Sequence, residues 1–360
     1  MSEQKSQALK CLFPLNIKND FIFNPSSRDF IVTEIPLYEF SGEGEHLVLY
    51  VRKKELTTWE MIEAIAKFLD MKQAEIGYAG LKDKHAMTMQ YISLPAKYAE
   101  KMMDFKHENI KILNSQKHNN KLRVGHLKGN HFKVRLKKVL GIQKDKLDST
   151  LKWIKANGIP NYFGVQRFGN SGNNWQEGRD IIEGKLKIRN RKNSEFLIGA
   201  YQSYLFNGWL SKRVELSILL DKFSEQEVEQ ILNLEADTLK NVKKQKNFFK
   251  ILEGDLMMHY PHGRVFSVED ELGESERFST KDIAPTGLIA GERVSLATHK
   301  AKIFEEPFNL STKQSGSRRY AWIWVEEIKR EYIEEKAQYE LSFFLPKGCY
   351  ATNVIDVLRG

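Results

Sequence analysis

The sequence contains few cysteines and no long apolar run, and both shortages exclude classes of protein. Cys11 and Cys349 are the only two cysteines in 360 residues, which rules out a disulfide framework and a four-cysteine zinc site and indicates a reducing compartment. No window reaches the roughly 18 consecutive apolar residues that a membrane-spanning helix needs. Residues 1–15 lack the basic start, apolar centre and small-residue cleavage site of a secretory signal. We therefore expect a cytoplasmic protein that does not associate with membranes.

Glycine-rich cofactor loops and clusters of metal ligands are also missing. The sequence has no Walker-type phosphate loop, no GxSxG nucleophile elbow and no glycine-rich loop after a strand. The last absence argues against an RNA methyltransferase. His259 and His262 lie three residues apart, but Pro261 between them argues against a shared helical face, so we expect no metal site.

Negative charge is scarce in one part of the chain. The sequence has 56 Lys and Arg against 47 Asp and Glu, a net charge of +9. Residues 117–138 contain no acidic residue, three histidines and eight of the basic residues: Lys117, Lys121, Arg123, Lys128, Lys133, Arg135, Lys137 and Lys138. A concentrated basic window of this kind is the electrostatic footprint of a nucleic-acid partner.

Apolar periodicity predicts an α+β fold with a β-rich start. The segments that are typical of strands are 29–35, 46–53, 75–80, 88–95 and 130–138. In 130–138, apolar Phe132, Val134 and Leu136 alternate with basic side chains, so we expect one face in the core and one basic face in solvent. Thr57 and Glu60 have the spacing of a capping box at the start of a helix.

The remainder of the chain changes character twice. Residues 144–158 are typical of a helix that ends at Gly158, and helical patterns follow over 194–218 and 225–250. Strand-like sequence returns at 320–328 and 339–346. A β-rich start and end around a helical middle predict one domain interrupted by an insertion.

The segment AGLKDKHAMT (79–88) places Asp83 between Lys82 and Lys84 in a polar turn after a strand. Flanking ammonium groups keep a carboxylate ionised and attract a phosphodiester backbone, so Asp83 is a candidate nucleophile or base. The alternative is a solvated turn in which Asp83 caps a backbone amide.

Two aromatic segments have a similar ambiguity. Phe132 is either a core residue or a stacking surface for an unpaired base among basic side chains. The segment NYFGVQRFG (161–169), which contains Arg167, is either a tightly packed turn or an edge that contacts RNA.

Taken together, these segments resemble the TruD family of pseudouridine synthases. The resemblance extends from about residue 29 to residue 359. The matching pieces, in chain order, are DFIVTE (29–34), SGEGEHL (41–47), AGLKDKHAMT (79–88), KLRVGHLKGNHF (121–132), GIPNYFGVQRFG (158–169), IGAYQSYLFN (198–207) and LPKGCYATNVIDVLR (345–359).

The resemblance implies a role for each matching residue. Asp83 occupies the position of the family's catalytic aspartate, and Phe132 that of the aromatic residue that stacks on the target uracil. Asn130 matches a polar residue that holds the aspartate and the target region in place. Lys82 and Lys84 are expected at the substrate, and together with Lys18 they are candidates for the basic partner of Asp83. The residues expected to bind RNA are Lys121, Arg123, Lys128 and Arg167.

The resemblance also implies a V-shaped, two-domain molecule that acts on uridine 13 in the D arm of tRNA. We expect a catalytic pseudouridine-synthase core with a mixed or antiparallel sheet in residues 1–157 and 306–360, and an inserted α/β TRUD domain in residues 158–305. The expected partner is tRNA, with no obligate protein partner and a monomeric protein.

Isomerising uridine to pseudouridine breaks the N1–C1′ bond, rotates the uracil and rejoins it through C5. Nothing is oxidised, hydrolysed or transferred between molecules, so we expect no cofactor. The reaction requires a flipped base, a stacking surface and a carboxylate near the sugar, which either attacks C1′ or removes a proton from C2′. A non-catalytic RNA-binding or RNA-folding module explains the charge equally well, but leaves the Asp83 turn unexplained.

Overall fold

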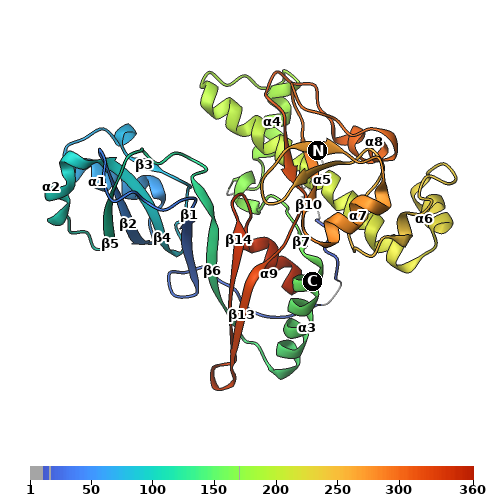
Figure 1. Cartoon of the computed structure of the whole chain (residues 1–360), viewed down its shortest axis with the longest axis horizontal. Coiled ribbons are helices and arrows are strands. Elements are labelled where there is room, and N and C mark those ends of the chain that lie inside the picture. The colour runs from blue at the N-terminus through green and yellow to red at the C-terminus, as the bar shows by residue number, and fades with distance from the viewer. Residues whose placement is uncertain (1–10, 16–17, 170) are drawn as a thin grey trace, which may run out of the picture. The chain divides into compact units, whose positions relative to one another are not determined.

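The computed structural model describes residues 11–15, 18–169 and 171–360. The chain divides into two compact units (Figure 1). One comprises residues 19–149 and 325–349, and we call it the large-sheet unit. The other comprises the described residues up to 18, 150–324 and 350–360, and we call it the small-sheet unit. The chain therefore leaves the large-sheet unit once and returns to it, as an insertion requires.

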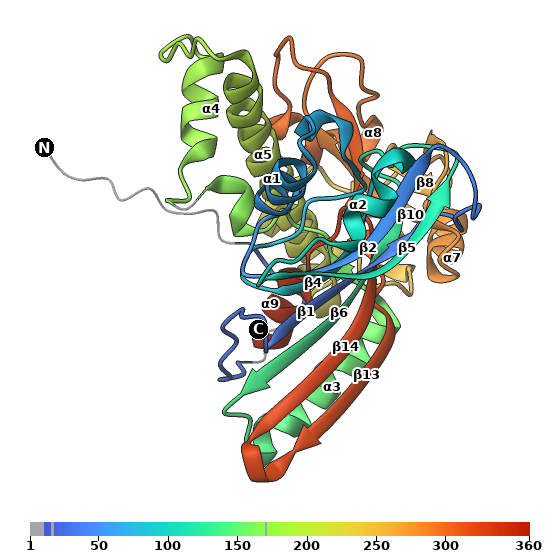
Figure 2. The ribbon, with the colours of Figure 1, turned by 90° about the vertical axis from the view of Figure 1, so that its left-hand side faces the viewer.

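The large-sheet unit is built on one mixed sheet of eight strands, in the order β13-β14-β6-β1-β4-β2-β5, with β3 paired to β4 (Figures 1 and 2). All neighbours are antiparallel except β1 and β4. The strands are β1 (Phe30–Pro36), β2 (His46–Lys54), β3 (Gly77–Tyr78), β4 (Met87–Pro95), β5 (Ile110–His118), β6 (Leu127–Lys137), β13 (Glu326–Ile333) and β14 (Gln338–Pro346).

Helix α1 (Thr58–Leu69) covers part of one face of this sheet, and the short helix α2 (Ala99–Met103) follows β4. The predicted capping box is present, since Thr57 and Glu60 bond each other's backbone at the start of α1. Met61, Ile62 and Ile65 are fully buried in a cluster that includes Leu49 and Val51 of β2. This packing fixes the start of α1 against the sheet.

The small-sheet unit surrounds the 32-residue helix α5 (Arg191–Lys222). A four-stranded sheet has the order β11-β10-β8-β9, and β12 pairs with β7. The strands are β7 (Ile159–Pro160), β8 (Leu256–His259), β9 (Val265–Ser267), β10 (Ile283–Ile289), β11 (Ser317–Tyr320) and β12 (Trp322–Ile323). The other helices are α3 (Gly141–Asn157), which spans the unit boundary, α4 (Asn174–Ile182), α6 (Glu225–Leu232), α7 (Glu271–Ser279), α8 (His299–Glu305) and α9 (Ala351–Arg359).

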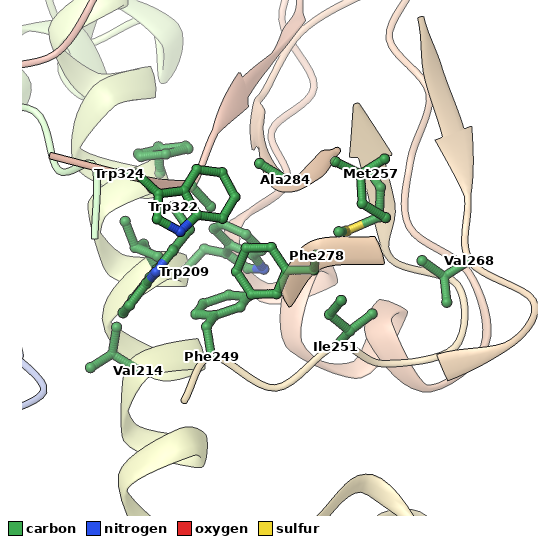
Figure 3. Close-up of a cluster of buried hydrophobic side chains, with 14 of the residues drawn as sticks. Trp209, Val214, Phe249, Ile251, Met257, Val268, Phe278, Ala284, Trp322 and Trp324 are labelled. Atoms are coloured by element: carbon green, nitrogen blue, oxygen red, sulfur yellow. The ribbon is translucent and has the colours of Figure 1, made fainter. Parts of the chain in front are cut away.

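Aromatic side chains fill the core of the small-sheet unit. Trp209 of α5 and Trp322 of β12 are buried in one cluster with Phe249 and Phe278 (Figure 3). Arg213, one helical turn after Trp209, is buried beside this cluster and binds both carboxylate oxygens of Asp255 at 2.6 and 2.8 Å. The paired ions and the packed rings hold α5 against the loops that precede β8.

The predicted α+β fold with a mixed sheet is confirmed, but two local predictions were wrong and one sheet was missed. The helix predicted over 225–250 ends at Leu232, because Asn233 adopts a left-handed conformation (φ 52°) that stops it. The small sheet was not predicted at all, since three of its strands have only three or four residues and β10 is buried on both faces and shows no alternation. The strand predicted at 320–328 is divided among β11, β12 and β13. The units divide the chain at 18/19, 149/150, 324/325 and 349/350. The domain boundaries expected at 157/158 and 305/306 stay a prediction.

Within the part of the chain that the structure describes, no helix combines the length and the apolar character needed to cross a membrane.

Candidate active site

Asp83 lies on the turn of residues 80–86, between β3 and β4, which we call the Asp83 turn. The side chains of this turn differ sharply in burial. Asp83, Lys84 and His85 are exposed, whereas Lys82 and Ala86 are buried. The turn therefore exposes the Asp83 carboxylate, while the buried side chains of Lys82 and Ala86 anchor the backbone before and after the exposed residues.

Hydrogen bonds from three elements fix the backbone of the Asp83 turn. The Lys82 amide donates to Thr58 Oγ1 (2.9 Å), and this hydroxyl donates to Gln90 Oε1 of β4 (3.1 Å). The Lys53 ammonium of β2 donates to the Asp83 carbonyl oxygen (2.8 Å). All of these side chains are buried, so water does not compete for these bonds.

A buried ion pair anchors the turn to strand β1. The Lys82 ammonium bonds Glu34 Oε2, and their side chains are only 5% and 1% exposed. The second carboxylate oxygen of Glu34 accepts a hydrogen bond from the Tyr91 amide (3.1 Å). Burial raises the pKa of Glu34, although the ammonium of Lys82 opposes this effect. Since Lys82 is committed to Glu34, a direct contact of Lys82 with substrate stays a prediction and requires this pair to open.

The exposed basic residues of the turn lie next to carboxylates of α1 and the loop before it. Lys84 Nζ lies 3.1 Å from Glu60 Oε1, and His85 Nδ1 lies 3.4 Å from Glu55 Oε2. The backbone amide of Thr57 and then Lys84 hold the pKa of Glu60 at about 2. Lys18 is exposed and belongs to the small-sheet unit. The basic partner of Asp83 stays a prediction for Lys18, Lys82 and Lys84 alike.

Asn130 shares a sheet face with the buried ion pair. On β6, Asn130 is paired in register with Glu34 of β1 and Leu345 of β14, and residues directly opposite in antiparallel strands project from the same face. The Asn130 amide oxygen is buried, and no hydrogen-bond partner for it is found among the described residues. A buried acceptor without a donor is costly, which marks it as a place where a ligand donor is favoured.

Phe132 lies two residues further along the same face and is packed in the core. It is only 6% exposed, and its ring centroid lies 6.0 Å from that of Phe30 and 5.5 Å from that of Phe343. The expected alternation of Phe132, Val134 and Leu136 is confirmed, since all three are buried. Stacking of a uracil on Phe132 stays a prediction, and it requires one ring face to be freed from these neighbours.

The opposite face of β6 is not the free basic surface expected from the sequence. Lys133 and Arg135 both bind the carboxylate of Glu340, at 2.6 and 2.7 Å, and Lys137 pairs with Asp29. The hydrogen bond from Lys133, together with Arg135, holds the pKa of Glu340 below its usual range. Glu340 comes from β14 and Asp29 from the loop before β1. Because both are distant in sequence from residues 130–138, the local sequence could not predict these pairs.

Lys121 and Arg123 do line an open cavity. Its volume is about 500 Å³, and the other lining residues are Tyr38, Glu39, His118, Asn120 and His126. Tyr38 stacks on His118 (centroids 5.3 Å apart), and its hydroxyl lies 2.8 Å from His126 Nδ1. The cavity thus combines aromatic faces with two cationic side chains, the composition that binds unpaired nucleotides.

The cavity is linked to residues 74–79, the segment that precedes the Asp83 turn. Lys121 Nζ donates to the Ala74 carbonyl oxygen (2.5 Å), and the Gly125 amide donates to that of Ala79 (2.8 Å). Lys128 is exposed at the start of β6. The structure therefore brings Lys121 and Arg123 to the segment that leads into the turn.

Arg167 occupies a different setting, in the small-sheet unit. Its Nε donates to Ser203 Oγ of α5 (3.1 Å), and its guanidinium lies 5.6 Å from the ring centroid of Phe196. Burial lowers the pKa of Arg167. Because these contacts hold Arg167 against α5, RNA binding by Arg167 stays a prediction.

The sequence analysis missed Lys53, Glu34, Thr58 and Gln90, all of which support the Asp83 turn. A signal for two of them was present. In β2, Lys53 continues the alternating buried positions Leu47, Leu49 and Val51, and in β1 Glu34 continues Phe30 and Val32. An ionisable residue at a position that the strand period assigns to the core is a signal of a buried polar site.

Among the residues that the structure describes, no three His, Cys, Asp or Glu side chains gather into a possible metal site.

A mixed sheet that carries both an anchored, exposed aspartate and a basic aromatic cavity suits an enzyme that acts on RNA. Comparisons with known proteins identify the class as the pseudouridine synthases. The family model of tRNA pseudouridine synthase D (TruD) matches residues 22–191 and 186–357. Proteins named tRNA pseudouridine synthase D are 52% identical over 337 residues in Sulfurimonas denitrificans (94% of each chain) and 46% identical over 354 residues in Helicobacter pylori (94% of this chain and 93% of the relative).

The fold agrees with a solved structure. The crystal structure of the protein described as tRNA pseudouridine synthase D from Methanosarcina mazei superposes with a TM-score of 0.70 and covers 97% of this chain and 95% of that one, at 19% identity. The chain belongs to the TruD family. The expected family and the expected enzyme class, an isomerase, are confirmed.

Proposed function

We propose that this protein converts uridine 13 in the D arm of tRNA to pseudouridine, with Asp83 as the catalytic carboxylate. The observation that carries the proposal is the contrast within the Asp83 turn. The Asp83 side chain is exposed, yet the buried side chains of Lys53 and Thr58 hold the Asp83 carbonyl oxygen and the Lys82 amide. Buried Glu34 in turn holds the side-chain ammonium of Lys82. An aspartate that only capped a surface turn would need no such support from three elements.

The chemistry asks for a carboxylate that is ionised and precisely placed. The Asp83 oxygen either attacks C1′ as the N1–C1′ bond breaks or removes the proton from C2′, and both routes begin from the anion. An ordinary aspartate is ionised at neutral pH. Positioning then dominates the rate, since a misplacement of about 1 Å costs about a hundredfold. The rigid anchoring of the turn supplies that positioning.

We assign the recognition of the uracil to Asn130 and Phe132. The buried amide oxygen of Asn130, which shares a sheet face with Glu34, is a suitable acceptor for the N3–H donor of uracil. The Phe132 ring lies two residues away on that face and contributes an apolar wall for the detached base. Phe132 contacts the rings of Phe30 and Phe343, and full stacking on uracil requires one face of the Phe132 ring to be freed from them.

We assign the RNA backbone to Lys121 and Arg123, with Lys84 and Lys128 as further cationic contacts. Phosphate contacts of this type position an RNA without reading its sequence. The cavity beside Tyr38 offers aromatic faces to unpaired bases. In this proposal, residues 1–157 and 306–360 form the catalytic core and residues 158–305 the TRUD insertion, with Arg167 as its RNA contact. The reaction uses no cofactor.

Base-resolution mapping of pseudouridine in total tRNA, from cells with and without the gene, tests the function and the target together. The expected result is the loss of the signal at position 13 and its restoration when purified protein is added to the unmodified tRNA. A signal lost at another position would correct the target. An unchanged map would instead favour a non-catalytic RNA-binding module.

A further inference from the structure

Lys53 is a lysine at a core position of the large sheet. It lies on β2, and its residue surface is 0% exposed. On that strand, its neighbours at two-residue intervals are buried apolar residues that pack under α1. A lysine is almost never fully buried unless its charge is paired, so its partners define its role.

The partners of Lys53 are backbone carbonyl groups. Its Nζ donates to the oxygen of Leu56 at 2.5 Å, of Asp83 at 2.8 Å and of Lys82 at 3.4 Å. An ammonium has three donors and no acceptor, so these three contacts use its whole capacity. Two of them belong to consecutive residues of the Asp83 turn, and one of these is Asp83 itself.

Stability alone does not account for a lysine at this position. Burial disfavours the charged amine and lowers the pKa of Lys53 to about 8, although the carboxylates of Asp83, Glu60 and Glu55 oppose this effect. An apolar side chain fits a core position at lower cost, since replacing buried ions by well-packed apolar residues is often neutral or stabilising.

We propose that Lys53 is a positioning residue, whose ammonium fixes the backbone of Asp83 and thereby sets where the carboxylate meets the sugar. This inference rests on the proposed catalytic role of Asp83. Lys53 touches no substrate atom in this account and acts only through the turn. Its closest structural counterpart, the Glu34–Lys82 pair, anchors the other side of the same turn.

The proposal predicts that turnover falls as pH rises through about 8, because the neutral amine has fewer and weaker donors for the three carbonyl groups. The charged groups around Lys53 are Asp83, Lys82, Glu60 and Glu55, with Lys84 and His85 paired to the last two. The stability contribution of Lys53 has the opposite sign. Since its folded pKa is below its unfolded value, the unfolded chain binds more protons between about pH 8 and 10.5, and this contribution to stability rises with pH.

The test compares Lys53→Met and Lys53→Arg with the parent and with Lys54→Met, the neighbour on the other face of β2. Single-turnover rates are measured with saturating tRNA between pH 6.5 and 9.5, together with tRNA affinity. We expect Lys53→Met to lose about a hundredfold in rate while its affinity stays within threefold, and Lys54→Met to match the parent. Lys53→Arg carries a charge that does not titrate in this range, so its remaining activity lacks the decline above pH 8.

Two results overturn the proposal. One is a Lys53→Met rate within threefold of the parent in an assay where Asp83→Asn is inactive. That result would reject the role of Lys53 and leave the catalytic role of Asp83 intact. The other is a parent rate that stays constant from pH 7 to 9.5. This measurement uses only the parent protein, so it does not depend on whether a variant folds. Full turnover by Asp83→Asn would instead overturn the proposed function itself.

Discussion

Replacing Lys82 by methionine tests how strongly the Asp83 turn depends on its buried ion pair. Methionine keeps the length and apolar stem of the side chain but removes the ammonium that bonds Glu34. The Glu34 carboxylate then keeps the hydrogen bond from the Tyr91 amide but has lost its ammonium partner. Its side chain is 1% exposed, so water cannot replace the lost charge.

Removing one partner of a buried ion pair costs about 3–5 kcal/mol, because the remaining charge stays desolvated and uncompensated. We expect the free energy of unfolding of Lys82→Met to fall by that amount at pH 8. The double variant Glu34→Leu/Lys82→Met removes both charges and should recover most of the loss, since apolar residues of similar volume often replace such pairs at little cost. Neither variant should retain the parent rate, because the turn loses its anchor to β1.

The measurement is urea denaturation of the two variants and the parent at pH 8 and at pH 5. Without the ammonium, the pKa of Glu34 in the folded state rises further above its unfolded value. The folded variant then binds more protons than the unfolded chain, so its stability falls as pH rises and its deficit is smaller at pH 5. A loss below about 1 kcal/mol at pH 8, the range of exposed pairs, would show that the Glu34–Lys82 pair does not anchor the turn.

Three further predictions concern packing, RNA binding and cofactors. Phe132→Ala should cost about 3–5 kcal/mol of stability because the Phe132 ring is buried. Phe132→Leu should fold and still lose turnover if the ring stacks on uracil. Thermal melts and single-turnover rates separate the effect on stability from the effect on turnover. Arg123→Gln should reduce the slope of log affinity for tRNA against log salt by about one, and Lys133→Gln, paired with Glu340, should leave it unchanged; equal slopes would place the RNA elsewhere. Purified protein should modify prefolded tRNA in EDTA, and activity restored only by Zn²⁺ would contradict a cofactor-free reaction.

The sequence was sufficient for the local signals of the fold. The capping box at Thr57 and Glu60, the alternation along β6 and the glycine end of α3 at Gly158 are each encoded within a few residues. They were therefore predictable. The small sheet was not predictable, because β8, β9 and β11 have only three or four residues and the seven-residue β10 is buried on both faces and shows no alternation. The end of α6 was not predictable either, because a left-handed asparagine leaves almost no periodic signal.

The exposed residue of the candidate site, Asp83, was predictable from the sequence, but the buried side chains that hold its turn were not. The turn chemistry and family resemblance led to Asp83, but Glu34, Lys53 and Gln90 come from three other strands and meet the turn only after folding. The same reason explains the error on β6. Its basic face is balanced by Asp29 and Glu340, and the register that places Glu340 beside Arg135 is a property of the sheet.

The catalytic role of Asp83 is tested by the single-turnover rate of Asp83→Asn on unmodified tRNA, measured together with its tRNA affinity. Asparagine keeps the size of the side chain and removes the charge on which both chemical routes depend. We expect no detectable pseudouridine, with tRNA affinity within a few-fold of the parent or slightly tighter, because one negative charge near phosphate is lost. Asp83→Glu should also fail, since one methylene displaces the carboxylate by about 1 Å or more. Pseudouridine formation by Asp83→Asn near the parent rate would show that Asp83 is not the catalytic carboxylate.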